Sequence, residues 1–200
     1  MIPREGALLR TRSVRCRSVD EVHRTATDLV DTWPTVAAHG IAAPQIGVLK
    51  RLFIYRPYDA EDEEPTVLLN PRVIKVAGEL KDFDGCLSVP TIYGQTRRAA
   101  RIDIQATTLL GETVRLRFED FDARIIQHEM DHLDGVLFID RLDSLDDLYT
   151  YQEVRRERAE EADDAADEEE RHLETVPLTP DQRAFIEQNR RPLPGIALRW

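Results

Sequence analysis

Two histidines that flank a glutamate are the residues whose types and spacing most directly indicate chemistry in this 200-residue chain. The segment His128–His132 reads HEMDH, so its two imidazoles stand four residues apart, on one face of a helix, where both can bind one divalent ion. Glu129 follows the first histidine, where its carboxylate can reach a water on that ion and take up a proton. The pattern predicts a metal-dependent hydrolase.

Two imidazoles leave a divalent ion short of protein ligands. The position six residues after His132, where one group of zinc peptidases has a third histidine, is Phe138, which excludes that pattern. Glu153 lies at about the spacing at which thermolysin-like peptidases supply a glutamate ligand. Cys86 offers a thiolate, which binds such ions strongly, and Gly85 before it permits a bend that aims the sulfur. We favour Cys86 and keep Glu153 as the alternative.

Two helices are predicted within the first 135 residues, and the second carries this chemistry. Ser18 followed by Glu21 has the form of a capping box, and apolar residues then recur at helical spacing, which predicts a helix over Val19–Trp33. A second apolar stripe, which includes both histidines, predicts a helix from about residue 120 to residue 133, with Gly135 in the position that ends it. This second helix would hold the two imidazoles in a fixed relation.

Short β-branched or apolar segments separated by turn residues predict strands between the two helices. Alternating residues on both sides of the corner Leu110–Glu112 predict a hairpin. We also expect a short strand over Val136–Ile139 and a helix that starts near Asp143 and runs past Tyr151. The predicted fold is α+β, with mixed or antiparallel β-sheets packed around a central helix that carries the HExxH motif, and with a C-terminal helical extension. The strand segments are Leu52–Tyr55, Val67–Leu69, Val73–Val76, Ile102–Ala106 and Val114–Phe118.

The composition is that of a globular protein in water, with 42% hydrophobic, 6% aromatic and 32% charged residues. The longest apolar runs fall far short of the roughly 20 residues that a membrane-spanning helix needs. Arginines interrupt the N-terminal stretch, so no signal peptide is expected and the predicted location is the cytoplasm. In that compartment Cys16 and Cys86 are expected as free thiols or metal ligands rather than as a disulfide.

The formal net charge of −11 argues against a protein that grips nucleic acid over a broad basic face. Much of that charge lies in the acidic block of residues 160–170. We therefore expect a catalytic domain over residues 1–150 and an extension over residues 151–200. The extension would be an acidic helix and a proline-punctuated tail with one amphipathic piece around residues 183–188, and would not form part of the active site.

Three segments of the chain together resemble the sequence motifs of the peptide deformylases. They occur in the family's order and at plausible separations, and the resemblance covers about residues 5–145. It supports Cys86 over Glu153 as the third ligand. The segments are Gly40–Gln45 (GIAAPQ), Gly85–Ser88 (GCLS) and Gln127–Gly135 (QHEMDHLDG).

The resemblance implies a hydrolase of protein biosynthesis that removes the formyl group from the N-terminal methionine of nascent polypeptides. It implies one divalent ion held by Cys86, His128 and His132, natively Fe²⁺, with Zn²⁺, Ni²⁺ or Co²⁺ in some preparations. The ion would activate a water, and Glu129 would take the proton from that water and pass it to the leaving amine. The partners implied are an N-formylated peptide and, transiently, the ribosome.

The same resemblance assigns roles to residues outside the metal site. The side-chain amide of Gln45 and the backbone N–H of Leu87 would hold the developing oxyanion. Arg98 aligns with a basic residue that follows the family's second motif. The residues implied in substrate binding are His39, Gly40, Gly85 and Arg98.

The chain departs from the family's pattern close to the expected substrate. Ala38 stands where the first motif has glycine, and His39 where the family usually has an apolar residue. Asp84 replaces a glutamate, while Asp120 and Asp122 replace a glycine and an apolar residue. An imidazole turned inward at position 39 would favour a substrate with a polar or acidic group there.

Three alternatives to this function remain open. The first is a specialised deformylase for another N-formyl compound, because the departures lie close to the expected substrate while none of them changes a metal ligand. The second is a thermolysin-like metallopeptidase that uses Glu153. The third is a binding protein without catalysis, since a fold by itself does not establish an activity.

Overall fold

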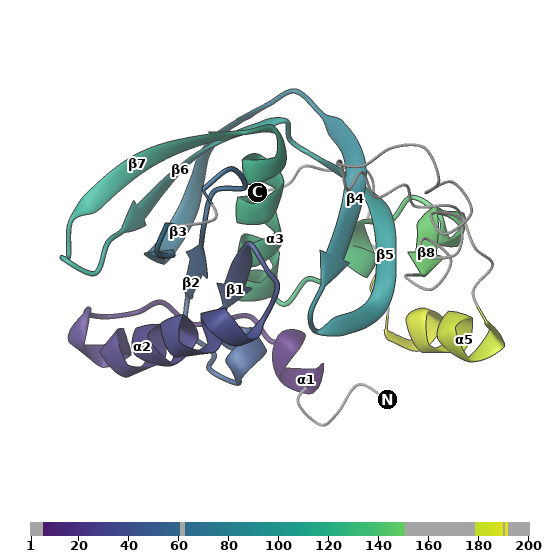
Figure 1. Ribbon diagram of the computed structural model, residues 1–200, viewed down its shortest axis with the longest axis horizontal. Coiled ribbons are helices and arrows are strands. Elements are labelled where there is room, and N and C mark those ends of the chain that lie inside the picture. The colour runs from purple at the N-terminus through teal and green to yellow at the C-terminus, as the bar shows by residue number, and fades with distance from the viewer. Residues whose placement is uncertain (1–5, 61–62, 151–178, 190, 192–200) are drawn as a thin grey trace, which may run out of the picture. The chain divides into compact units, whose positions relative to one another are not determined.

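The structure, a computed structural model, describes residues 6–60, 63–150, 179–189 and 191 (Figure 1). The described residues divide into two compact units. The first holds those between residues 1 and 80 and between 98 and 137, and the second those between 81 and 97 and between 138 and 193. Both units draw on the segment 1–150, so the division at residue 150 stays a prediction.

The first unit is built on a five-stranded antiparallel sheet with the strand order β1-β2-β3-β6-β7. β6 and β7 pair from Arg101 opposite Glu119 to Thr107 opposite Thr113, so the predicted hairpin is confirmed. The strands are β1 (Gly40–Ala42), β2 (Leu52–Tyr55), β3 (Thr66–Ala77), β6 (Arg101–Thr107) and β7 (Thr113–Glu119).

β3 differs from its prediction, because one long strand replaces the two predicted over Val67–Leu69 and Val73–Val76, which Asn70 and Pro71 separate as predicted turn residues. Asn70 has a φ of 50°, and the register with β6 shifts between Leu69 and Arg72, so the expected turn residues form a bulge in a continuous strand. The Asn70 side chain fixes this bulge. It accepts from the Cys16 N–H at 2.8 Å and donates to the Cys16 carbonyl at 2.9 Å.

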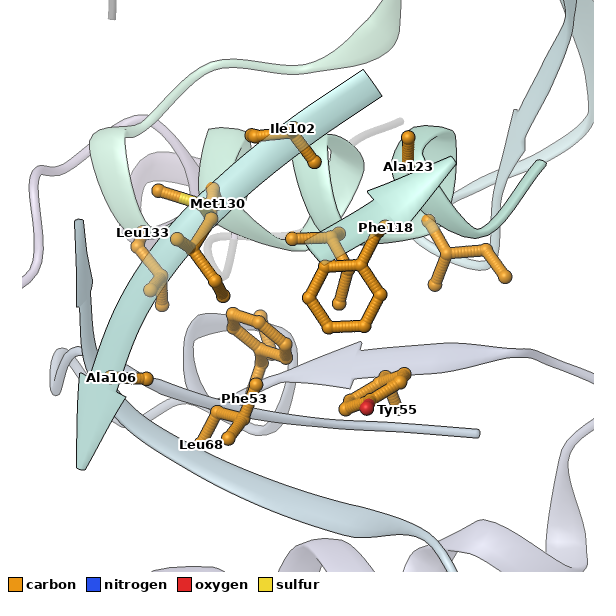
Figure 2. Packing of buried hydrophobic residues seen from close by; sticks show 13 residues of the cluster. Phe53, Tyr55, Leu68, Ile102, Ala106, Phe118, Ala123, Met130 and Leu133 are labelled. Carbon is orange, nitrogen blue, oxygen red and sulfur yellow. The ribbon is translucent and has the colours of Figure 1, made fainter. Parts of the chain in front are cut away.

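The predicted motif helix is confirmed as α3 (Asp120–Asp134), which packs against the sheet through a buried hydrophobic cluster (Figure 2). Phe53 and Tyr55 of β2 meet Met130 and Leu133 of α3 in this cluster. The Tyr55 ring also meets the Phe118 ring of β7 edge to face, with 5.3 Å between centroids. The cluster thus joins the helix to a central strand and to an edge strand.

A second cluster lies on the other side of β2, beneath α2 (His23–Thr32). Because successive side chains of a strand point to opposite faces, Leu52 and Ile54 join this cluster while their neighbours join the first. Burial on both faces explains why β2 is uniformly apolar. The predicted helix over residues 19–33 is confirmed in outline, as η1 (Asp20–Val22), α2 and η2 (Trp33–Thr35).

The second unit contains a three-stranded sheet with the order β4-β5-β8, and β8 pairs antiparallel with β5. Mixed α+β structure with antiparallel sheets and a C-terminal helix is therefore confirmed. The elements are β4 (Leu80–Cys86), β5 (Val89–Arg98), η4 (Phe138–Arg141), η5 (Leu145–Asp147), β8 (Leu148–Thr150) and α5 (Pro180–Asn189). None of the helices in the described part of the chain has the length and apolarity that a bilayer crossing requires.

Two predictions near the end of the motif region are wrong. The strand expected over Val136–Ile139 is absent, and η4 begins halfway along it, at Phe138. The helix expected from Asp143 onward is cut short as η5, where Ser144 Oγ accepts from the Asp146 N–H at 3.1 Å, and the chain then extends to pair with β5. The gain from pairing with a distant strand outweighs the local helical preference. The part of this helix predicted beyond residue 150 lies outside the described residues.

The end of α3 gives a test of backbone strain. Gly135 has a φ of 74°, and a Cβ there would lie 2.8 Å from the Arg10 carbonyl carbon and oxygen, whereas Gly111, with a φ of 79°, has nothing within 4 Å. We expect Gly111→Ala to lower the free energy of unfolding by about 1 kcal/mol from left-handed strain alone. Gly135→Ala should cost about 2 kcal/mol or more, because the Arg10 backbone must also move. Urea unfolding measures both, and equal losses would contradict the steric argument.

Candidate metal centre and active site

α3 presents the two predicted metal-binding histidines side by side. The His128 and His132 rings are 4.8 Å apart between centroids, with their planes at 80°. His132 is buried and His128 half-buried. Since positions four residues apart lie one above the other on a helix, this arrangement follows from the covalent spacing once α3 forms.

Within the described part of the chain, Cys86, His128 and His132 form a group that could hold a metal ion. Each residue offers one ligand atom, and these atoms all lie within 4.8 Å of one another. Metal bonds of about 2.0 to 2.3 Å place tetrahedral ligand atoms roughly 3.5 Å apart, so only small adjustments would close the group around an ion. A thiolate with two imidazoles is a donor set for a first-row divalent metal, and three protein ligands leave a coordination position open. The residues present therefore fit a catalytic ion.

The backbone that carries Cys86 is shaped by glycine. A Cβ at Gly85 would lie 2.7 Å from two ring carbons of Tyr93, so the Tyr93 ring packs directly on the Gly85 backbone. Next to it, the Asp84 carboxylate accepts from the Thr96 hydroxyl at 3.0 Å, and both side chains are buried. These contacts join the end of β4 to β5 on either side of the turn. Leu87, whose N–H is a predicted oxyanion donor, lies in that turn and is 47% exposed.

Gly40 lies against the predicted proton-transfer residue. A Cβ at this position would lie 2.5 Å from Glu129 Oε1 and 2.7 Å from Glu129 Cδ. Glu129 is only 3% exposed, so its carboxylate is held between α3 and the backbone of β1. Any side chain at position 40 would push that carboxylate away.

The Gln45 side chain is oriented by its own loop. η3 (Ala43–Ile46) follows β1, and Gln45 Oε1 accepts from the Ala42 N–H at 2.8 Å. This bond uses the oxygen of the amide, which orients the Nε2 end as the donor. A donor is what the predicted oxyanion role requires.

Two buried polar side chains of α3 attach the helix to the segment that leads into β6. Gln127 Oε1 accepts from the Ala99 N–H at 3.0 Å, and Gln127 Nε2 donates to the Ala99 carbonyl at 2.9 Å. Asp131 pairs with Arg98 at 2.8 Å, with side-chain exposures of 3% and 0%. Sequence reasoning had not singled out Gln127 or Asp131. The signal was available, since a charge inside a helical motif on the buried side implies a partner.

The remaining predicted residues are placed as follows. Arg98, expected beside the substrate, is fully buried in its ion pair, and we favour a positioning role for it. His39 is half-buried, and its ring packs near the Tyr58 and Phe121 rings. Glu153, the alternative ligand, lies outside the described residues.

The chain matches known sequences over the region that carries these residues. Residues 3–147 match the family model described as polypeptide deformylase. The chain is similar to the peptide deformylase of Thermomicrobium roseum, with 40% identity over 142 residues, 68% of this chain and 81% of that protein. The peptide deformylase of Dictyoglomus thermophilum is 41% identical over 135 residues, 67% of this chain and 86% of that protein.

Solved structures give the same result. A peptide deformylase from Synechococcus elongatus in complex with actinonin superimposes with a TM-score of 0.70 and 30% identity, covering 93% of this chain and 88% of that one. A peptide deformylase from Legionella pneumophila gives a TM-score of 0.65 at 34% identity, covering 69% of this chain and 82% of that one.

The contact between Gly40 and Glu129 predicts a selective loss of rate. We expect Gly40→Ala to keep its bound metal and to lose about a hundredfold in kcat, because displacement of a reacting group by about 1 Å can cost that much. Metal analysis and formate release measure the two quantities. Gly47→Ala is the control in the same loop, because its φ of 86° strains the backbone while a Cβ there meets nothing within 4 Å. Equal rates for the two variants would show that the Gly40 contact does not position the Glu129 carboxylate for catalysis.

The buried pair predicts a stability effect. Arg98→Met should lower the free energy of unfolding by about 3 to 5 kcal/mol, because it leaves the Asp131 carboxylate buried without its cation. The double variant Arg98→Met/Asp131→Leu should regain much of that loss, since no buried charge remains. Urea unfolding of the two single variants and the double variant measures the coupling. Additive losses would show that the two side chains act separately.

Proposed function

Because the chain belongs to the peptide deformylase family, we propose that it removes the formyl group from the N-terminal methionine of new polypeptides and releases formate. The family is one of metal-dependent hydrolases in protein biosynthesis, and the chain is an enzyme of this class. The observation that carries the proposal is the group of Cys86, His128 and His132, which come from two of the segments that resemble the motifs of that family.

A divalent ion bound by these residues would act as a Lewis acid and lower the pKa of a water. One thiolate and two imidazoles are its ligands in this proposal, and Fe²⁺ is the native metal by family resemblance. Zn²⁺, Ni²⁺ or Co²⁺ would substitute in preparations, because their preferred ligands overlap.

Glu129 is the proposed base and acid. Its carboxylate takes a proton from the attacking water, and the water oxygen forms a bond to the formyl carbon. The same carboxylate then gives the proton to the amine nitrogen as the carbon–nitrogen bond breaks. Its burial against Gly40 supports this role, because a fixed carboxylate loses little entropy in each transfer.

Two donors are proposed for the oxyanion that develops on the formyl oxygen. They are Gln45 Nε2, oriented by the bond from the Ala42 N–H to Gln45 Oε1, and the Leu87 backbone N–H. Gly40 and Gly85 are proposed, by family resemblance, to bind the substrate through their backbone groups, because Glu129 and Tyr93 fill the space where their side chains would lie.

The alternatives have less support. A metallopeptidase that uses Glu153 needs a residue outside the described part of the chain, whereas the Cys86 thiol lies with the two histidines. A binding protein without catalysis would have no need of a buried carboxylate beside the ligand group. We propose that the enzyme acts in the cytoplasm, where it would meet new chains during transient association with the ribosome.

The decisive test is formate release. The full chain, loaded with Fe²⁺ or Ni²⁺, is incubated with formyl-Met-Ala-Ser, and formate is measured. We expect turnover that depends on the metal. Internal cleavage of an unformylated peptide would support the metallopeptidase, and neither product would support the binding protein.

Glu129→Gln gives the sharpest test of mechanism. The amide keeps the shape of the side chain but cannot accept and return a proton, so we expect metal content to stay near one ion per chain while kcat falls by about 10² to 10⁴. Glu119→Gln, at an exposed position of β7, is the matched control and should keep its rate. A Glu129→Gln enzyme with near-normal activity would exclude this residue from the mechanism.

A further inference from the structure

The sheet of the first unit has a second, charged face over β3, β6 and β7, which lie side by side (Figure 1). On the face toward α3, Ile102 and Ile104 of β6 join the buried cluster. Because successive side chains of a strand point to opposite faces, the residues that alternate with these point away from α3. We call this outward surface the basic face, after its exposed cations Arg72, Lys75, Arg101, Arg115 and Arg117.

Part of the basic face surrounds a shallow hollow. Lys75 of β3 lies opposite Asp103 of β6, and Asp103 lies opposite Arg117 of β7. These residues line the hollow together with Arg101 and the small side chain of Ala77. The Arg117 guanidinium donates to both Asp103 carboxylate oxygens, at 2.7 and 3.1 Å. This bond lowers the pKa of Asp103, and the charges of Lys75 and Arg101 lower it further, so the field in the hollow is positive.

The next row of the basic face contains no carboxylate. Gln105 of β6 lies between Arg72 of β3 and Arg115 of β7, and Gln105 Oε1 accepts from Arg72 Nη2 at 2.8 Å. Arg115 and Lys75 form no ion pair within the described part of the chain. The positive charges of Arg72, Lys75 and Arg115 are therefore not neutralised by a carboxylate there.

This arrangement of cations suits a polyanion. Neighbouring strands are about 4.8 Å apart, so cations on β3 and β7 stand about 10 Å apart at their Cα atoms, too far for one small anion to meet all of them. A chain of phosphates can meet several at once, and a guanidinium can bind a phosphate through two parallel bonds.

The neutral side chains of the basic face distinguish between polyanions. The paired rows contain an alanine and a glutamine but no large apolar residue, whereas a protein interface usually has apolar or aromatic side chains at its centre. They also contain no aromatic ring on which a base could stack, so a nucleic acid would be held by its backbone alone. A flat sheet surface can carry an extended single strand.

We propose that the basic face binds the phosphodiester backbone of single-stranded RNA, without preference for base sequence. The net charge of −11 argues against a broad basic face, but this one is confined to three strands, and much of the negative charge lies in residues 160–170. The inference goes beyond the proposed function and does not depend on it, because none of these cations belongs to the metal group.

The test is the salt dependence of RNA binding. Binding of the full chain to a fluorescent oligouridine of about 15 nucleotides is followed by anisotropy from about 20 to 200 mM salt. Three cations without a carboxylate partner predict a slope of about −2 for log K against log salt, and an oligoadenosine should bind within about twofold of the oligouridine. No binding at about 20 mM salt, or a tenfold preference between the two sequences, would overturn the proposal.

Single charge removals assign the binding to the basic face. Lys75→Gln and Arg115→Gln should each weaken binding and reduce the slope by about 0.7, because each removes one phosphate contact. Arg183→Gln removes the same charge from an exposed position of α5 and should keep the wild-type slope. All three variants should keep the wild-type midpoint of urea unfolding, since the changed side chains are exposed. A wild-type slope in both basic-face variants would reject the assignment.

Other anionic partners are tested with the same protein. Poly-glutamate and vesicles of phosphatidylcholine with phosphatidylglycerol should bind at least about tenfold more weakly than RNA, because closely spaced phosphates release more counterions when they are neutralised. Equal or tighter binding of poly-glutamate would replace RNA by an acidic protein segment, and that of vesicles by a lipid surface. Formate release without RNA binding would reject this inference alone, whereas RNA binding without formate release would reject only the proposed function.

Discussion

The buried polar contacts of α3 with Arg98 and Ala99, which lead from β5 into β6, fix how far the helix is rotated about its own axis. Gln127 bonds to both the N–H and the carbonyl of Ala99, as a neighbouring strand would, and Asp131 forms a buried ion pair with the Arg98 guanidinium. Hydrophobic packing against the sheet tolerates small rotations of a helix, whereas these directional bonds do not. His128, Glu129 and His132 take their directions from that rotation.

Two glycines allow close packing of the backbone near the functional residues. On β1, Gly40 lets the chain lie against the Glu129 carboxylate, and on β4, Gly85 lets the Tyr93 ring lie against the strand that ends at Cys86. Both contacts fill the space that a Cβ would need. The functional side chains are thus held by steric exclusion as well as by bonds, which limits the conformational freedom they would lose in a reaction.

Two of the departures from the family's motifs contact the same residue, Tyr58. His39, Asp120 and Asp122 stand at positions where the family has apolar or small residues, and the structure joins two of them to Tyr58 through a ring contact and a hydrogen bond. A chain that keeps the metal chemistry while it rebuilds the adjoining surface is expected to change which peptides it accepts more than what it does to them.

The sequence by itself determined the features that depend on residues close to one another along the chain, within about one or two helical turns. The spacing of HEMDH placed two imidazoles on one helical face, Gly135 ended that helix, and alternation predicted the β6–β7 hairpin, because local geometry has a fixed period. Only the tertiary structure decided the features that need a distant partner. The bulge at Asn70 is held by a hydrogen bond to Cys16, and residues 148–150 form a strand because they pair with β5. Arg98 is buried in an ion pair with Asp131. Tyr58 met Phe121 across 63 positions of sequence, which no local pattern encodes, because such a contact exists only after the chain has folded.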